Sequence, residues 1–356
     1  MILRHVLKVI KQHIDRVSWM AISIMLLLHA GATWALLHYL GESELTSLVN
    51  YPYYYIVTTS TVGYGDFSPQ SEMGKWVVSV LQIPFGLALF GAVLGKLGQT
   101  VSKVMRRNMT GEKDFQHFTD HIIIFGWHPV RTKKMIDHIL GDSKRVQRSI
   151  LLCVTEDMLH PFSDYEQVDF AKLTSMTDKN ELTRVAISHA ARVIIDGEDD
   201  NQTFTTGLRI SGLVSAECHI SAYFEDETKM EMLRDHCSNI ECTTSKTAEM
   251  LVRTMQDPGA SRVQEEMLST LYGDTQFSLA IPAAVNGHTQ FKSLFHYFKD
   301  VHAATIIALA DNRIGDGMDL NPANDIVVKE GQILHYLAET RVLPNEVDWQ
   351  QIKTDA

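Results

Sequence analysis

Two long apolar stretches constrain this chain more than any other feature. Residues 19–40 contain no Lys, Arg, Asp or Glu, and residues 76–101 contain only Lys96, near their end. A helix needs about 20 apolar residues to cross a bilayer, and a terminal lysine can extend to the interface. The sequence therefore predicts two membrane spans. A cleaved signal peptide is the alternative for the first span, but that stretch is too long and no small-residue cleavage site follows it.

Charges on either side of the two spans indicate their orientation. The segment between them carries only one lysine, Lys75, and four acids, which are Glu42, Glu44, Asp66 and Glu72. The outer flanks are basic, with Arg4, Lys8, Lys11, Arg16, Lys103, Arg106 and Arg107. Positive charge stays on the cytoplasmic side, so we expect a multi-pass protein in the lipid bilayer with both termini cytoplasmic. Residues 1–17 alternate apolar and basic positions at helical spacing. This pattern favours an amphipathic interfacial helix or, alternatively, a cytoplasmic extension of the first span.

The segment between the spans contains the run TTSTVGYGD at residues 58–66. Backbone carbonyls can replace the water shell of a dehydrated K⁺ if they all point toward one axis. That geometry needs alternating backbone conformations, which Gly63 and Gly65 can adopt without a Cβ clash. Thr61 adds a hydroxyl oxygen, while Val62 and Tyr64 point away. Residues 45–60 can form a re-entrant pore helix whose C-terminal dipole favours a cation. One chain supplies one such strand, so a complete pore implies four chains.

Two spans around the run from Thr61 to Asp66 resemble the two-helix potassium channels. The resemblance implies a K⁺-selective homotetramer whose filter is made by Thr61, Val62, Gly63, Tyr64, Gly65 and Asp66. Tyr53 and Tyr54 stand where many relatives carry an aromatic pair that braces the filter tyrosine. Val57 stands where some relatives have a glutamate paired with Asp66, so this filter is expected to lack that tie. No arginine-rich helix precedes the first span, which argues against a voltage sensor.

The second span also contains a candidate hinge and gate. Pro84 removes a helical hydrogen bond and Gly86 loosens the same turn, so a bend is expected there. Relatives carry a hinge glycine in this part of the inner helix, offset by about one residue. Phe90, Leu94 and Leu97 recur at helical spacing on one face. Four copies of that face would make an apolar constriction able to stop ions by dewetting.

The second half of the chain alternates strand-like and helix-like segments. Strands are expected at residues 121–126, 149–154, 167–170, 191–196 and 219–223, and helices at 130–140, 200–213 and 228–236. This alternation predicts an α/β, Rossmann-like, doubly wound parallel sheet. Directly after a pore helix, it resembles the regulator-of-K⁺-conductance (RCK) domain. The pieces that carry the resemblance are HIIIFGW, ARVIIDGEDDN and DIVVKEGQILHYLAE, the last resembling the small α+β C-terminal lobe.

The expected organisation follows from these segments together. It comprises an interfacial helix at 1–17, a pore domain at 18–107, a linker at 108–118, a Rossmann-like lobe at 119–244, a helical crossover at 245–272, a C-terminal lobe at 273–343 and a tail at 344–356. The resemblance implies that such crossovers join domains into a ring below the pore.

A nucleotide is one candidate ligand of the Rossmann-like lobe. The turn after its first strand keeps Gly126 but lacks the other two glycines of a dinucleotide loop, and Pro129 has no N–H. NAD in its usual pose is therefore not expected. Arg131 could meet a phosphate, and Glu156 or Asp157 a ribose, which leaves a mononucleotide open. The alternative is a crevice that binds nothing.

A divalent cation is the other candidate. The chain is similar to the calcium-gated archaeal channels, in which an Asp after the fourth strand and two Glu near the fifth bind Ca²⁺. Asp196 and Glu225 match two of these positions, but Tyr223 stands where the third carboxylate would be. The alternative is that these acids form a solvated rim.

The net charge of −11 argues against nucleic acid, and the four cysteines contain no CxxC pair. We expect a ligand-gated, K⁺-selective channel of a bacterial or archaeal inner membrane, not an enzyme, with the ring completed by this chain or by additional soluble RCK domains. The alternative is a membrane-tethered nucleotide-dependent oxidoreductase or a regulatory nucleotide-binding protein. The broken glycine loop and the lack of a placed His–acid constellation count against it.

Overall fold

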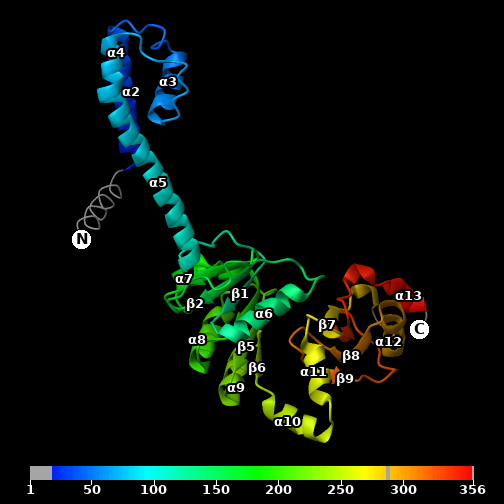
Figure 1. Cartoon of the computed structure of the whole chain (residues 1–356). Helices are drawn as coiled ribbons and strands as arrows, with labels where there is room; N and C mark the ends of the chain where they lie inside the picture. The colour runs from blue at the N-terminus through cyan, green and yellow to red at the C-terminus, as the bar shows by residue number, and fades with distance from the viewer. Residues whose placement is uncertain (1–17, 286–288, 355–356) are drawn as a thin grey trace. The chain divides into compact units, whose positions relative to one another are not determined.

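The computed structural model describes residues 18–285 and 289–354 (Figure 1). The chain divides into two compact units, Met1–Arg107 and Asn108–Ala356, and each is described by itself below. The predicted interfacial helix at residues 1–17 lies outside the described residues.

The first unit contains both predicted spans. Helix α2 (Trp19–Tyr39) begins at Ser18, whose hydroxyl accepts a hydrogen bond from the Ala21 N–H at 3.1 Å. The second span is longer than expected. It runs from residue 72 to residue 110 as α4 (Glu72–Val77), a π-helical turn η1 (Val78–Gln82) and α5 (Ile83–Thr110). Both are long and apolar enough to cross a membrane. Helix α3 (Asn50–Thr59), predicted as a pore helix over residues 45–60, is shorter than expected.

A six-stranded parallel sheet forms the centre of the second unit. Its strand order is β3-β2-β1-β4-β5-β6, the doubly wound order of Rossmann folds. The strands are β1 (His121–Phe125), β2 (Ile150–Val154), β3 (Val168–Lys172), β4 (Ala190–Ile195), β5 (His219–Phe224) and β6 (Ile240–Thr244). The helices are α6 (Pro129–Gly141), α7 (Lys179–Arg184), the 3-10 turn η2 (Ile187–His189), α8 (Asp200–Ser211) and α9 (Glu227–His236). The predicted fold class is confirmed.

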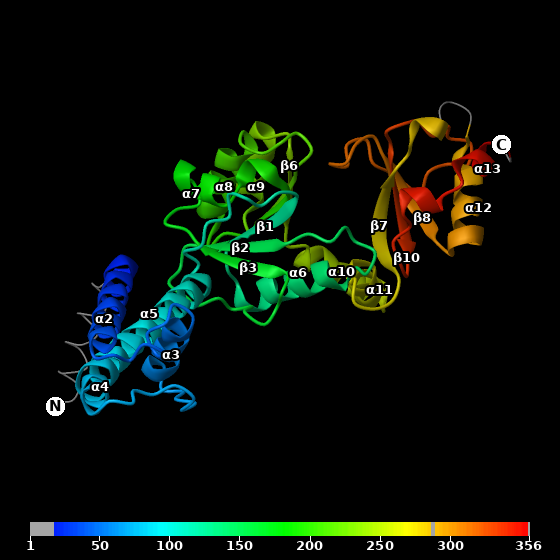
Figure 2. The ribbon, with the colours of Figure 1, turned by 90° about the horizontal axis from the view of Figure 1, so that it is seen from above.

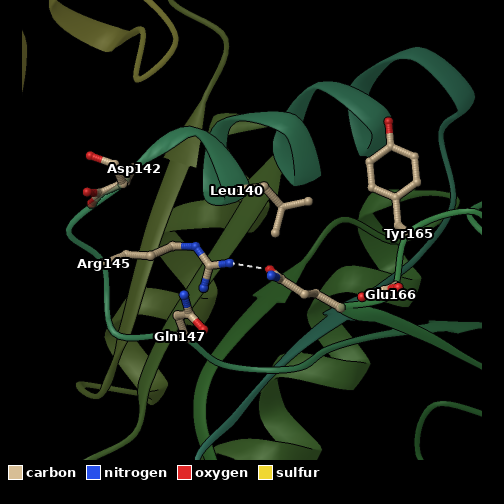
Figure 3. Close-up of a pocket in the computed structure, with 8 residues that line it drawn as sticks. Leu140, Asp142, Arg145, Gln147, Tyr165 and Glu166 are labelled. Atoms are coloured by element: carbon tan, nitrogen blue, oxygen red, sulfur yellow. Dashed lines mark hydrogen bonds between the residues drawn. The ribbon is translucent and has the colours of Figure 1, made fainter.

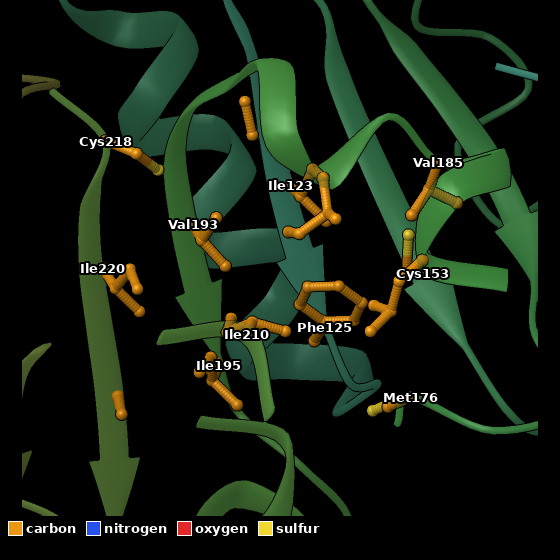
Figure 4. Packing of buried hydrophobic residues seen from close by; sticks show 14 of the residues in the cluster. Ile123, Phe125, Cys153, Met176, Val185, Val193, Ile195, Ile210, Cys218 and Ile220 are labelled. Atoms are coloured by element: carbon orange, nitrogen blue, oxygen red, sulfur yellow. The ribbon is translucent and has the colours of Figure 1, made fainter. Parts of the chain in front are cut away.

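Both faces of this sheet are covered, which explains why its central strands are apolar throughout. Along β1, Ile123 and Phe125 pack into one cluster with Ile210 of α8 (Figure 4). Ile122 and Ile124 pack into a second cluster with Ile136 of α6. Strands buried on two sides need no polar face, and β1 and β2 are buried at every position.

Strand β6 and helix α7 of this lobe were not predicted. The expected crossover is two helices, α10 (Thr247–Gln256) and α11 (Ala260–Leu268), because Pro258 and Gly259 interrupt it. Gly259 has a φ of +99°, a left-handed conformation that separates helix α10 from helix α11.

The C-terminal lobe is an antiparallel sheet of order β7-β10-β8-β9. Its strands are β7 (Thr275–Ala280), β8 (Thr305–Ala310), β9 (Asp319–Leu320) and β10 (Ile333–Ala338). Its helices are α12 (Phe291–His302) and α13 (Trp349–Thr354), with 3-10 turns η3 (Ala283–Val285) and η4 (Pro344–Glu346). Figure 2 shows α12 beside β8 and β10. Leu294 and Phe298 of α12 pack with Tyr336 of β10 in the core of this lobe.

Candidate functional site

The pore helix is attached to both spans by tyrosine hydroxyl groups. Tyr51 donates to the Ala30 carbonyl at 2.6 Å, and the Tyr55 hydroxyl lies 2.6 Å from Nδ1 of His29, so both contact α2. Tyr54 donates to Oε1 of Gln82 in the π-helical turn at 3.1 Å. The aromatic run of α3 therefore fixes the position of the loop that follows it.

That loop alternates between left-handed and ordinary backbone conformations. The φ angles of Thr61, Gly63 and Gly65 are +64°, +57° and +79°. Positive φ was predicted for the two glycines and is confirmed; that of Thr61 was not predicted. The Gly63 N–H donates to the Val57 carbonyl at 3.1 Å, which ties the loop to the end of the pore helix. An alternating backbone is what a row of carbonyls facing one axis requires.

Asp66, directly after this loop, is held by a partner that the sequence did not suggest. The Tyr53 hydroxyl donates to Oδ2 of Asp66 at 2.6 Å. Val57 supplies no polar group, as expected, so a tyrosine makes the tie that a glutamate was expected to make in relatives. The Tyr54 hydroxyl is bonded to Gln82, and its predicted role in bracing Tyr64 stays a prediction.

The irregular part of the second span lies one turn before the predicted hinge. The π-helical turn at Val78–Gln82 ends just ahead of Pro84, which has no N–H to continue an α-helical ladder. Gly86 is a close-packing position. A Cβ built on it would lie 2.5 Å from Cγ2 of Thr59 on the pore helix. Along α5, Phe90 is half-buried, whereas Leu94 and Leu97 are exposed within one chain.

Glu42 is a buried acid between the spans that sequence reasoning assigned only to orientation. Its carboxylate accepts hydrogen bonds from the Gln70 N–H at 3.0 Å and from the N–H and hydroxyl of Ser71 at 2.8 and 2.7 Å. Burial acts to raise the pKa of Glu42, but the bonds from Gln70 and Ser71 outweigh it and lower that pKa. This contact joins the end of α2 to the start of α4.

At the carboxyl edge of the parallel sheet, β1 and β4 meet where the strand order reverses, the usual place for a ligand crevice. Gly126 has a φ of +106°, and a Cβ there would lie 1.7 Å from the Asp196 carbonyl oxygen. Strand packing alone therefore requires this glycine. Asp196 is buried, and Arg131 binds both its carboxylate oxygens at 2.6 Å. A phosphate that meets Arg131, as predicted, would therefore compete with Asp196 for this side chain.

The other predicted ligand residues are dispersed around this edge. The Arg131 guanidinium lies 4.6 Å from the centre of the Tyr223 ring, a cation–π contact. The Glu225 N–H donates to Asp200, which also accepts from the Asp226 N–H. Elsewhere, Glu156 accepts from the Thr155 N–H, and Asp157 pairs with Lys172. Within residues 18–285 and 289–354, no group of three or more His, Cys, Asp or Glu side chains is placed to hold a metal ion.

Parts of this chain are similar to known channel proteins. A family described as ion channel matches residues 22–103. A Bacillus subtilis protein named as a potassium channel, YugO, is 23% identical over 281 residues, which cover 77% of this chain and 83% of YugO. The calcium-gated potassium channel TvoK of Thermoplasma volcanium is 25% identical over 166 residues, or 47% of this chain and 45% of TvoK.

Two solved structures share part of the arrangement at low similarity. The GsuK channel bound to NAD has a TM-score of 0.42 and 16% identity, over 88% of this chain and 55% of that one. The human SLO3 gating ring has a TM-score of 0.43 and 13% identity, over 62% of this chain and 44% of that one. The matched family consists of membrane channels, not of a class of enzymes. Residues 22–103 thus match an ion-channel domain, and the chain joins two candidate spans and a filter-like loop to a Rossmann-like lobe, with similarity to the potassium channels YugO and TvoK.

Proposed function

We propose that four copies of this chain form a K⁺-selective pore in a bacterial or archaeal inner membrane, with the carbonyls of residues 61–65 as its filter. The observation that carries the proposal is the alternation of positive φ at Thr61, Gly63 and Gly65. Backbone dipoles arranged in this way can replace the hydration shell of K⁺ without a charged side chain. Both termini are cytoplasmic in this proposal, as the basic flanks favour.

The RCK-like domain is proposed to control the pore through α5. That helix runs without interruption from Ile83 to Thr110, past the boundary between the two units at Arg107. A continuous helix can carry force from a ring of cytoplasmic domains to the residues Phe90, Leu94 and Leu97. We propose a ring made from this chain or completed by additional soluble RCK domains, and the mass of the purified assembly distinguishes the two.

We place the gating ligand at the Arg131–Asp196 pair. A divalent cation would have to take Asp196 from Arg131, and an anionic nucleotide would have to take Arg131 from Asp196. TvoK is named as calcium-gated and GsuK as bound to NAD, so relatives offer examples of both chemistries. The buried state of Asp196 favours the cation, because a carboxylate that loses its guanidinium partner needs another positive charge.

Two measurements test this function. Liposomes containing the full-length protein should show K⁺ flux that exceeds Na⁺ flux, and no flux at all would favour the tethered oxidoreductase or nucleotide-binding protein. Calorimetry should show that the full-length protein binds Ca²⁺ and that this binding is lost in the double variant Asp196→Asn, Glu225→Gln. Equal Ca²⁺ binding before and after those substitutions would remove both residues from the ligand site.

A further inference from the structure

A large cavity of about 940 Å³ lies between the Rossmann-like lobe and the C-terminal lobe of the second unit. Its wall on the Rossmann-like side is formed near the amino ends of parallel strands, by Ile122 of β1, Arg192 of β4 and His219 of β5. Arg192 is the register partner of both Ile122 and His219. The cavity is therefore at the opposite edge of the sheet from the Arg131–Asp196 pair, and it is a separate site.

The side chains around this cavity are strongly basic, although the whole chain carries a net charge of −11. Its lining contains two carboxylates, Asp142 and Glu241, and six Lys or Arg residues, which are Lys144, Arg145, Arg148, Arg192, Arg313 and Arg341. The excess is four positive charges, with the histidines counted as neutral. A concave surface of one sign concentrates ligands of the other sign.

Three of the six cations are bound to partners within the protein at 2.8 Å or less. Lys144 pairs with Glu346 at 2.8 Å, and Arg341 with Asp142 at 2.7 Å. Arg145 donates to the Gln167 side chain at 2.6 Å in a neighbouring pocket of about 340 Å³ (Figure 3). The Lys144–Glu346 and Arg341–Asp142 pairs join the two lobes. Lys144, Arg341 and Arg145 therefore have structural roles and are not counted as ligand-binding residues.

The other three cations that line the cavity are Arg148, Arg192 and Arg313. Nε of Arg148 pairs with Asp120 at 3.0 Å, and Arg313 lies 3.9 Å from the exposed Glu217 carboxylate. Arg192 is half-buried and donates to the Ala191 carbonyl at 2.6 Å, and no carboxylate in the described part of the chain pairs with it. Burial lowers the pKa of Arg192, and the nearby Arg148 and Arg313 lower it further. Arg148, Arg192 and Arg313 thus line the same cavity, and of the three only Arg148 has a carboxylate partner closer than 3.9 Å among the described residues.

We propose that this cavity binds a phosphorylated small molecule with at least two adjacent anionic groups, which bridge Arg148 and Arg192 of one lobe to Arg313 of the other. Guanidinium groups bind phosphate oxygens in pairs of charge-assisted hydrogen bonds. The volume suits a ligand of nucleotide size. Ile122, Leu279 and Ile333 supply an apolar part of the wall for the rest of such a molecule. The inference goes beyond the proposed function, and binding can be measured whether or not the pore conducts.

The test is calorimetry on the full-length protein in detergent, with inorganic tripolyphosphate as the probe. We expect saturable binding that weakens as KCl is raised. Arg192→Gln and Arg313→Gln should each weaken binding about tenfold or more. Arg209→Gln is the matched control because it removes an equal charge from an exposed position on α8, away from the cavity lining, and it should leave binding unchanged. Inorganic sulfate, which cannot bridge two sites, should bind at least about tenfold more weakly.

Four results would overturn the proposal. These are no saturable tripolyphosphate binding, equal affinity for sulfate, equal weakening by the Arg209 variant, and loss of binding in Arg131→Gln but not in the cavity variants. Because Arg192 is half-buried, its variant is first checked for an unchanged thermal unfolding transition. The Arg313 side chain is 62% exposed, so its replacement does not disturb the core and provides the decisive measurement if the Arg192 variant fails to fold.

Discussion

Gly63 in the filter loop and Gly126 after β1 both have positive φ, but their surroundings differ. A Cβ added to Gly63 would meet nothing within 4 Å in its own chain, whereas one added to Gly126 would lie 1.7 Å from the Asp196 carbonyl oxygen. The first glycine is required only for its backbone conformation. The second is required for conformation and for space. Replacing each with alanine should therefore separate a loss of conduction from a loss of folding.

The largest effect is expected from Gly126→Ala. Because β1 and β4 must move apart to admit the methyl group, the second unit should lose about 4 kcal/mol or more of stability. Thermal unfolding of the full-length protein, followed by fluorescence, measures this loss. An unchanged transition would mean that the two strand ends separate easily, which would remove the contrast with Gly63.

Gly63→Ala is expected to abolish K⁺ selectivity while the fold remains. The strain of placing alanine at positive φ is about 1–2 kcal/mol, too little to unfold the unit but enough to turn a carbonyl away from the axis. Reversal potentials with K⁺ and Na⁺ on opposite sides should fall toward zero. Gly31→Ala is the control, because Gly31 lies in α2 with open space around its Cβ position. Unchanged preference for K⁺ in the Gly63 variant would disprove the filter assignment.

A charge below the filter should change gating without changing selectivity. Leu97→Asp places a carboxylate on the Phe90–Leu94–Leu97 face, where it would keep water and ions in a narrow apolar constriction. We expect open probability without ligand to rise about tenfold. Single-channel recordings give both open probability and the K⁺-to-Na⁺ ratio. Activity no higher than that of the parent would place the gate elsewhere, with the filter as the next candidate.

A smaller effect is expected from Tyr53→Phe, which removes the hydroxyl that binds Asp66. Since the Tyr53 side chain is exposed, loss of this one bond should shift the equilibrium between filter states by only roughly fivefold. The filter should leave its conducting state about five times as often, seen as shorter open bursts. Tyr39→Phe, at the exposed end of α2, should leave burst length unchanged. Equal bursts in both variants would show that the Asp66 contact is dispensable.

The smallest effect concerns pH and the stability of the second unit. His121 is fully buried, and burial lowers its pKa below the ordinary 6.5. The unfolded chain therefore binds a proton that the folded chain does not, and stability falls as pH falls below about 6.5, by at most about 1.4 kcal/mol per pH unit. His121→Gln should flatten the dependence of melting temperature on pH, whereas the exposed His117→Gln should not. Parallel curves for the two variants would contradict this.

The helices and strands that were predicted correctly from the sequence are those with a clear local pattern of apolar and polar residues. The two spans, the pore helix and most parallel strands are apolar runs bounded by polar residues. Strand β6 reads Ile240-Glu-Cys-Thr-Thr, and its outer position leaves Glu241 exposed, so the chain offers no apolar run there. The break between α10 and α11 at Pro258 was predictable from the sequence, because a proline ends the helix that precedes it.

Contacts between distant residues could not be predicted from local patterns. Arg131 and Asp196 are 65 positions apart, and Glu42 and Ser71 are 29 apart. Each pair depends on which strands or helices become neighbours, which no local spacing encodes. The backbone of the filter was predictable because glycine at alternate positions has few other uses. The bond from Tyr53 to Asp66 was not predictable, because the resemblance assigned Tyr53 to Tyr64 and no local pattern links a tyrosine to an acid thirteen residues later.

The π-helical turn at Val78–Gln82 has a consequence for any comparison of inner helices. A π turn contains one residue more than an α turn, and each residue advances an α-helix by about 100°. Every side chain beyond Gln82 is therefore rotated by about 100° from where an uninterrupted α-helix would place it. Deleting one residue within this turn would restore α geometry but turn a different side of α5 toward the pore axis. The turn therefore acts as one extra residue in this helix, and in the proposed pore it sets which side of α5 faces the axis.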